Sequence, residues 1–256
     1  MDHLIDEGMG RSILVVHGGM GDLSSWVKVT DRLRDRFRVV RLHRRQYRLD
    51  VPRKVTIAEE AEEVLAAAAT LDRPVLVGHS SGAVVALEAL VAAEPGQFAG
   101  AVLYEPPLVV DRPLGGEAND RARAAVAAGK PGTAFEIFLR DVVGVRGLLP
   151  TAARLMLNRR GGEMGDRVER QLDDNDAINA VGNRLAAYSK IEIPVLLVGG
   201  DRSPRHLRER LDAVRAVLPD TRRVTMHGQG HTAEQSAPAR VAAIVARFAD
   251  ETDPDR

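Results

Sequence analysis

The feature that most constrains the fold of this 256-residue chain is a regular alternation of short apolar runs with longer helical patterns. Six runs have the length and composition of β-strands: residues 13–16, 39–42, 75–77, 101–104, 195–198 and 223–226. Between them, alanine, leucine and charged residues recur at helical spacing over residues 58–69, 83–93, 205–218 and 238–249. Strands that alternate with helices favour right-handed crossovers. The chain is therefore predicted to form an α/β fold with an open, mostly parallel sheet covered by helices.

The alternation stops between residues 107 and 190, where helical stretches broken by glycine and proline carry no strand pattern. We interpret this segment as a helical insertion that covers the edge of the sheet as a cap or lid. The predicted organisation is a core formed by residues 1–106 and 191–256, with the cap, residues 107–190, inserted between its two parts. Few residues precede the first clear strand, so we expect a sheet of six or seven strands.

Composition excludes several classes of function. Lys+Arg and Asp+Glu are both 36, so the basic excess of a nucleic-acid-binding domain is missing. With no cysteine, neither disulfides nor thiolate metal sites can form. The chain shows no signal-peptide pattern and no long apolar stretch, which predicts a cytoplasmic protein without a membrane partner. It contains no Gly-X-Gly-X-X-Gly motif after a strand, no Walker lysine and no ligand-spaced histidine cluster, so we expect no cofactor and no metal ion.

The most specific motif is Gly78-His79-Ser80-Ser81-Gly82, which follows a buried apolar run and opens a helical one. A tight turn between strand and helix needs small residues at both flanks, which Gly78 and Gly82 provide. Such a turn lifts the hydroxyl of Ser80 off the sheet as a nucleophile. It also places the amide of Ser81 at a helix start, where it can bind a developing oxyanion. The plainer reading, a common serine- and glycine-rich loop, fits the strand-turn-helix context less well.

A second glycine-rich loop, His17-Gly18-Gly19-Met20, directly follows the first apolar run. If this loop turns toward the nucleophile, the amide of Gly19 or of Met20 completes an oxyanion hole with the amide at the helix start. The alternative is a flexible turn at the end of a strand. The presence of the serine motif favours the functional interpretation.

Histidine is the usual base for a serine hydroxyl, and seven histidines are present. His231 is the candidate, because it lies in a glycine-rich loop after the last apolar run, where it can face the nucleophile across the sheet edge. His227, in the same loop, lies closer to the strand and is expected to be structural. His17 and His79 are expected to be buried and hydrogen-bonded. The other histidines are expected at the surface: His3, His43 and His206.

The imidazole needs a carboxylate that fixes its tautomer and stabilises its charged form. Two acids at strand ends are candidates. Glu105 closes the run 101–104 and is followed by two prolines that restrain its backbone, whereas Asp201 follows the run 195–198. Each also has a structural interpretation, Glu105 as an acceptor for loop amides and Asp201 as a helix cap.

Together, the Ser80 motif, the His-Gly-Gly loop, the late Gly-Gln-Gly-His and the order Ser, acid, His resemble the α/β-hydrolase superfamily over nearly the whole chain. The resemblance implies a helical cap after the family's sixth strand. Most members carry the acid after the seventh strand in a Gly-X-X-Asp pattern, but counting from Gly199 the fourth position here is Arg202. A subset that includes the haloalkane dehalogenases carries it after the sixth strand, at a distance from the nucleophile like the 25 positions between Ser80 and Glu105. We therefore prefer Glu105, and Asp201 remains the alternative.

These residues predict a cofactor-free serine hydrolase that acts on a small or medium ester or thioester through an acyl-enzyme. An alternative on the same fold is a lyase, cyclase or oxygenase, in which the His-carboxylate pair abstracts a proton from carbon and Ser80 only donates a hydrogen bond. A ligand-binding protein without turnover is a third interpretation, which the complete set of reactive residues disfavours. The expected partner is a small-molecule substrate, free or carried as a thioester by a carrier protein. The sequence does not indicate an oligomeric state.

Two further patterns leave alternatives open. Nine arginines between positions 32 and 53 either form a docking surface for an acidic carrier protein or its phosphopantetheine, or line a solvated helix and an exposed strand. Within this run, Arg44, Arg45 and Tyr47 are candidates for the rim of the active site. Apolar residues of the insertion are expected to pack in its core or to line a pocket: Phe135, Phe138, Leu139, Leu148, Leu149, Leu155 and Met156.

Overall fold

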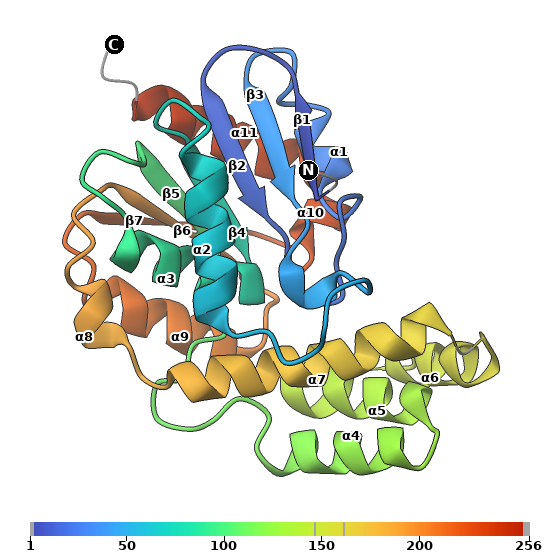
Figure 1. Ribbon diagram of the computed structural model, residues 1–256. Helices are drawn as coiled ribbons and strands as arrows, with labels where there is room; N and C mark the ends of the chain where they lie inside the picture. Colours follow the sequence, from blue (N-terminus) through green and yellow to red (C-terminus); the bar gives the residue numbers. More distant parts are fainter. Residues whose placement is uncertain (1–2, 146, 161, 253–256) are drawn as a thin grey trace.

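A seven-stranded sheet forms the centre of the computed structural model, which describes residues 3–145, 147–160 and 162–252 (Figure 1). The strands are β1 (Leu4–Glu7), β2 (Ser12–Val16), β3 (Arg38–Leu42), β4 (Val75–His79), β5 (Gly100–Tyr104), β6 (Val195–Gly200) and β7 (Thr221–Met226). Their order across the sheet is β1-β3-β2-β4-β5-β6-β7. All neighbours are parallel except β1 and β3, which are antiparallel. The predicted open, mostly parallel sheet is confirmed.

The strand that the apolar pattern did not reveal is β1, at the edge of the sheet. Its sequence, Leu-Ile-Asp-Glu, contains no apolar run of strand length, because an edge strand is less completely covered than a central one. Its acidic side chains pair with arginines of β3, Asp6 with Arg38 at 2.6 Å and Glu7 with Arg41 at 2.9 Å. Pairs of opposite charge across neighbouring strands support this edge.

Helices cover both faces of the sheet, because alternate residues of each strand point to opposite sides. On β2, Leu14 and Val16 belong to the apolar core that includes α2, α3 and α9, whereas Ile13 and Val15 belong to the core with α1, α10 and α11. In Figure 1, α2 and α3 lie in front of the sheet and α11 behind it. These helices are α1 (Val27–Thr30), α2 (Ile57–Ala68), α3 (Ser81–Ala92), α9 (Arg205–Arg215), α10 (Ala233–Ser236) and α11 (Pro238–Glu251).

The expected helical insertion is confirmed: the described chain between β5 and β6 forms helices and loops. The helices are α4 (Glu117–Ala127), α5 (Pro131–Ile137), the π-helical η2 (Phe138–Val143), α6 (Leu149–Arg160), α7 (Glu163–Val181) and α8 (Leu185–Tyr188). In Figure 1, α4 to α7 form a layer below the sheet, which we call the cap. The cap has a small apolar core of its own, formed by Ala122, Ala134, Leu157, Val168 and Leu172.

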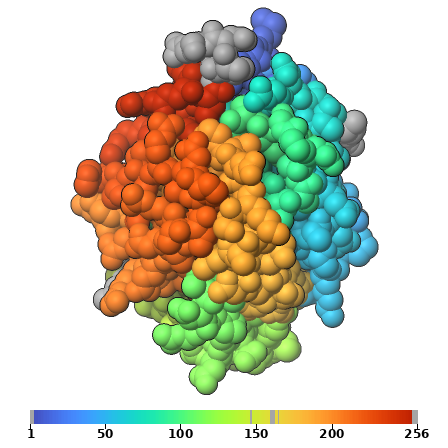
Figure 2. All heavy atoms as spheres, turned by 90° about the vertical axis from the view of Figure 1, so that its left-hand side faces the viewer, coloured from blue at the N-terminus to red at the C-terminus, as the bar shows by residue number. Residues whose placement is uncertain are grey.

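The cap packs against the sheet domain through α7, which contacts α2 and α3. Tyr188 of α8 is buried in the apolar core that contains α2 and α3. In the space-filling view, the yellow-to-orange chain that returns from the cap lies between the green-to-blue N-terminal half and the orange-to-red C-terminal part (Figure 2).

No helix in the described part of the chain combines the length and the hydropathy needed to cross a membrane.

Candidate active site

Ser80 lies in the turn between β4 and α3, with backbone angles φ 53° and ψ −127°. A positive φ is strained for a residue other than glycine, and such strain is concentrated at functional sites. The flanking glycines are required by space, because a Cβ on Gly78 would lie 2.6 Å from Cα of Ala83, and one on Gly82 would lie 2.6 Å from the carbonyl oxygen of Val16. The expected tight strand-turn-helix geometry is therefore present.

The structure brings together three of the candidate residues from distant parts of the chain. The Ser80 hydroxyl oxygen lies 2.9 Å from Nε2 of His231, and Nδ1 of His231 lies 2.7 Å from Oε2 of Glu105. Glu105 follows β5 with a φ of 45°, a second strained backbone position, and its side chain is fully buried. The hydrogen-bond order is serine, imidazole, carboxylate.

The surroundings of Glu105 favour its ionised form. Burial acts to raise its pKa, but the hydrogen bonds from His231 and from the Gly200 amide, at 2.8 Å, outweigh burial, and the pKa of Glu105 is lowered. A carboxylate at this position accepts the Nδ1 proton of His231. The lone pair of Nε2 then faces the Ser80 hydroxyl, as a base requires.

Two buried aromatic side chains hold the loop that carries His231. The hydroxyl of Tyr104 donates to the Gly230 carbonyl, and Nε2 of His79 donates to the His231 carbonyl at 2.9 Å. Burial lowers the pKa of His79, so its ring stays neutral and keeps one nitrogen as donor. The structure thus places His79 as the buried, hydrogen-bonded histidine that the sequence predicted.

Asp201, the alternative acid, does not lie beside His231. Its carboxylate accepts the Gly228 amide at 2.8 Å, and its other oxygen lies 3.2 Å from Nδ1 of His227. Asp201 and His227 are both exposed. These contacts hold together the loops after β6 and β7, a role different from the helix cap that we considered for Asp201.

The glycine-rich loop after β2 lies directly against the nucleophile. A Cβ on Gly18 would be 3.0 Å from Cβ of Ser80, closer than most side-chain contacts, so glycine favours this approach. Gly19 and Met20 line the same cavity as Ser80 and Ser81. Ser81 is the first residue of α3, where a backbone amide has no acceptor within the helix. Both expected sources of oxyanion donors therefore border the reactive serine.

The remaining histidines divide into one expected and one unexpected group. His17 is buried, and its Nδ1 donates to the Gly18 carbonyl at 2.8 Å; burial lowers its pKa to about 3. The three histidines expected at the surface are partly buried, so that prediction was wrong: His3, His43 and His206. His206 lines the cavity, because α9 faces the cap at this point.

A cavity of about 760 Å³ lies between the sheet domain and the cap, with Ser80 and His231 in its wall. Its cap side is largely apolar, with Phe135, Phe138, Leu139, Leu149 and others. Of the apolar residues expected in the core or the pocket, four are exposed, and Leu149 is the one among them that also lines the cavity: Leu148, Leu149, Leu155 and Met156.

Sequence reasoning missed the polar part of the cavity wall. Gln171 and Asn175 of α7 line the cavity, and the side-chain NH2 group of Gln171 donates to Oδ1 of Asn175 at 3.1 Å. Their spacing of four residues puts them on one face of the helix. This spacing is the sequence signal that could have identified the pair. Glu234 of α10 and Arg202 of the loop after β6 also line the cavity.

The arginine-rich run is only partly at the surface. Arg38 is half-buried and paired with Asp6, as expected of a solvated strand edge, but Arg41 and Arg44 are buried. A uniformly solvated or docking run was therefore a wrong prediction for these two residues, because each finds a buried or half-buried carboxylate partner. In the described ranges 3–145, 147–160 and 162–252, no three His, Asp or Glu side chains are grouped so that they could hold a metal ion.

Residues 13–244 match the Alpha/beta hydrolase family. The chain belongs to this family. Among solved structures, an α/β hydrolase from Sphaerobacter thermophilus DSM 20745 is 25% identical, with a TM-score of 0.77 over 96% of this chain and 95% of that chain. MenH from S. aureus is 14% identical, with a TM-score of 0.74 over 98% and 99% of the two chains. An esterase from Exiguobacterium antarcticum is 14% identical, with a TM-score of 0.71 over 96% and 94%. The last two share the fold alone, and no curated protein is significantly similar in sequence.

Proposed function

We propose that this α/β hydrolase is a serine hydrolase that cleaves a small or medium carboxylic ester or thioester through an acyl-enzyme. The observation that carries the proposal is the continuous hydrogen-bond chain from the Ser80 hydroxyl through His231 to Glu105, at 2.9 and 2.7 Å. A buried carboxylate, an oriented imidazole and a strained serine at a helix start form the arrangement that activates a serine hydroxyl. Asp201 is not part of this proposal.

In the proposed reaction, Nε2 of His231 takes the proton from Ser80 as the serine oxygen attacks the carbonyl carbon. Glu105 stabilises the imidazolium that forms. The amides of Ser81 and of Gly19 or Met20 bind the oxyanion, and each such donor is worth roughly 2.7–4 kcal/mol in the transition state.

When the intermediate collapses, the bond from the carbonyl carbon to the alcohol oxygen or thiol sulfur breaks. The leaving group then takes the proton from His231. A water molecule, deprotonated by the same imidazole, then attacks the acyl carbon. The bond from this carbon to the Ser80 oxygen breaks, His231 returns the proton to Ser80, and the acid is released. Every proton transfer thus uses one nitrogen of His231.

The cavity supports an acyl group of modest size as substrate. Its volume of about 760 Å³ lies within the usual range for pockets that bind small molecules, and its cap side is apolar. The apolar residues of the cap suit the hydrocarbon part of an ester, while Gln171 and Asn175, which also belong to the cap, on α7, offer hydrogen-bonding groups.

The test is covalent capture of the serine. We expect a fluorophosphonate probe to add its mass to the native protein and not to Ser80→Ala, and p-nitrophenyl butyrate to release p-nitrophenol in a burst equal to the active-site concentration. Equal turnover by Ser80→Ala and native protein would refute the role of Ser80. Substrate turnover without labelling would instead support proton abstraction by the His231–Glu105 pair, and tight ligand binding without turnover would support a binding protein.

A further inference from the structure

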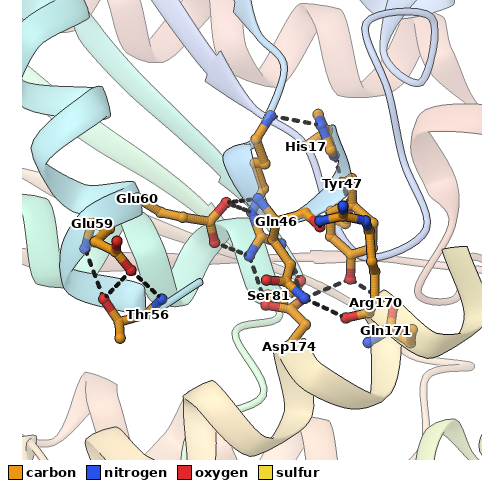
Figure 3. A network of polar contacts seen from close by, with 12 residues as sticks. His17, Gln46, Tyr47, Thr56, Glu59, Glu60, Ser81, Arg170, Gln171 and Asp174 are labelled. Carbon is orange, nitrogen blue, oxygen red and sulfur yellow. Dashed lines mark hydrogen bonds and ion pairs between the residues drawn. The ribbon is translucent and has the colours of Figure 1, made fainter. Parts of the chain in front are cut away.

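Behind the glycine-rich loop and the start of α3 lies a buried set of polar residues, which we call the Arg44 cluster: Arg44, Tyr47, Glu60, Ser81 and Asp174 (Figure 3). Arg44 follows β3, Tyr47 belongs to the short helix η1 (Arg45–Tyr47), Glu60 to α2 and Asp174 to the cap helix α7. The side chains of Arg44 and Asp174 are 0% exposed, and that of Glu60 is 3% exposed. The cluster joins the sheet domain to the cap without contact with water.

Every N–H donor of the Arg44 guanidinium has an acceptor in this cluster. Nε and Nη2 donate to the two carboxylate oxygens of Glu60, and Nη1 and Nη2 donate to those of Asp174. The remaining Nη1 donor is 2.6 Å from Oγ of Ser81. Arginine has five donors in a planar fork, whereas lysine has three on a flexible stem. Two carboxylates therefore fix the guanidinium, and the guanidinium fixes Ser81.

The backbone of the same residue holds the opposite side of the proposed oxyanion hole. The amide of Arg44 donates to Nε2 of His17 at 3.1 Å, and Nδ1 of His17 donates to the Gly18 carbonyl at 2.8 Å. Burial, together with the charge of Arg44, lowers the pKa of His17 to about 3, so the ring stays neutral with one acceptor and one donor nitrogen. Figure 3 shows His17 on the far side of the cluster from Asp174. Arg44 thus holds the loop with its backbone and Ser81 with its side chain.

The cap helix contacts both the cluster and the loop. The hydroxyl of Tyr47 lies 2.7 Å from Oδ2 of Asp174 and 3.0 Å from Oε1 of Gln171. A Cβ on Gly19 would collide with the same Oε1 of Gln171, so α7 packs directly on the loop. Removing Asp174 from the cluster would leave buried N–H donors of Arg44 without these acceptors, although Glu60 would remain as its ionic partner, and an unsatisfied buried donor is unfavourable. The position of the loop therefore depends on the docked cap.

We propose that Arg44 is a positioning residue for both amides of the oxyanion hole, and that Asp174 makes this position depend on the docked cap. The inference rests on the proposed serine-hydrolase function. Arg44 does not line the cavity, so it acts through His17 and Ser81. Oxyanion bonds strengthen only as the tetrahedral intermediate forms. Misplaced donors therefore lower kcat and leave KM nearly unchanged.

The test compares Arg44→Lys, Ser81→Ala and Asp174→Asn with the matched control Arg45→Lys. Arg45 is the adjacent residue; although the sequence made it a candidate for the rim of the active site, it is not among the residues that line the cavity. Its side chain is 37% exposed and pairs with Glu63 at 3.1 Å. We would measure kcat and KM for p-nitrophenyl butyrate, and the inhibition constant of a trifluoromethyl ketone with the same acyl chain. That ketone forms a tetrahedral adduct with the serine, and its oxyanion occupies the hole.

For Arg44→Lys we expect kcat to fall roughly 10- to 100-fold, less than the 10²–10³ that follows complete loss of one donor. The inhibition constant should rise by the same factor while KM stays close to the native value. Ser81→Ala, which keeps its backbone amide, and Asp174→Asn should show smaller changes in the same direction, and Arg45→Lys should behave as native.

Unchanged kcat and inhibition constant in folded Arg44→Lys would overturn the inference. If Arg44→Lys does not fold, unchanged values in Ser81→Ala would overturn it. So would a rise in KM without loss of kcat, because a purely structural role would alter the cavity and not the transition state. Failure of the native protein to form an acyl-enzyme would overturn the proposed function and this inference together, whereas labelled native protein with unaffected variants would overturn this inference alone.

Discussion

Replacing Glu105 by glutamine tests the proposed acid, because the substitution keeps the shape of the side chain and inverts one hydrogen bond. Oε1 of Glu105 accepts the Gly200 amide at 2.8 Å, and Oε2 faces Nδ1 of His231 at 2.7 Å. In the variant, the Gly200 amide retains the carbonyl oxygen, so the NH2 group faces His231. Two donors cannot share a hydrogen bond, and Nδ1 of His231 must become an acceptor.

The ring proton of His231 then lies on Nε2, which points at the Ser80 hydroxyl oxygen 2.9 Å away. The imidazole has no lone pair left to accept the serine proton, and its charged form has lost its carboxylate. In a Ser-His-Asp triad the corresponding substitution costs about 10⁴ in kcat, which is about 5.4 kcal/mol of transition-state stabilisation. We expect a fall of roughly 10³- to 10⁴-fold in kcat for Glu105→Gln. KM should change little, because Glu105 does not line the cavity.

The assay is steady-state hydrolysis of p-nitrophenyl butyrate, with active sites counted by fluorophosphonate labelling and folding checked by thermal melting. Asp201→Asn is the matched control, because Asp201 also follows a strand, and its carboxylate contacts His227 and the Gly228 amide instead of His231. It should keep nearly native kcat. The reasoning is refuted if Glu105→Gln retains more than about a tenth of native kcat, or if Asp201→Asn shows the larger loss.

Two further predictions concern stability. Gly82→Ala should destabilise the fold by about 1–3 kcal/mol or more, or prevent folding, because the added Cβ would lie 2.6 Å from a backbone oxygen. The control is Gly165→Ala in α7, where the added Cβ has an ordinary contact of 3.6 Å, so this variant should keep its stability. Equal urea midpoints for the two variants would contradict the prediction. The second prediction concerns His17, whose pKa is about 3 in the folded protein and 6.5 in the unfolded chain. As the pH falls from 6.5 toward 3, the unfolded chain binds a proton at His17 and the folded protein does not, so the free energy of unfolding decreases. At 1.36 kcal/mol per pH unit, the decrease reaches up to about 5 kcal/mol. Urea unfolding of native protein and His17→Asn at pH 7 and 4.5 should show a smaller pH dependence in the variant, and parallel losses would show that His17 does not cause it.

Local patterns predicted the sheet, the helical insertion and the reactive serine. The apolar runs predicted the strands correctly because a strand buried on both faces needs continuous apolar residues. The edge strand β1 was missed because it is less completely buried and does not need them. The tight turn at Ser80 could be predicted because the glycines that it requires lie within two residues of Ser80 in the sequence. The residues alone narrowed the candidate acid to Glu105 or Asp201, since both follow strands that end at the same edge of the sheet, and only the resemblance to a subset of the family favoured Glu105.

What the sequence by itself determined about this protein is therefore what neighbouring residues impose on one another: the alternation of strands and helices, the tight turn at Ser80 and the glycine-rich loop beside it. Tertiary structure alone decided which carboxylate meets His231, because Glu105 and His231 are 126 positions apart and their contact depends on how two strand ends and a loop converge. It also decided that Arg44 is buried, because its partner Asp174 comes from the cap, 130 positions away. A charged side chain is buried only where folding brings an oppositely charged partner to it, and the pattern of neighbouring residues does not show which distant residue that partner is.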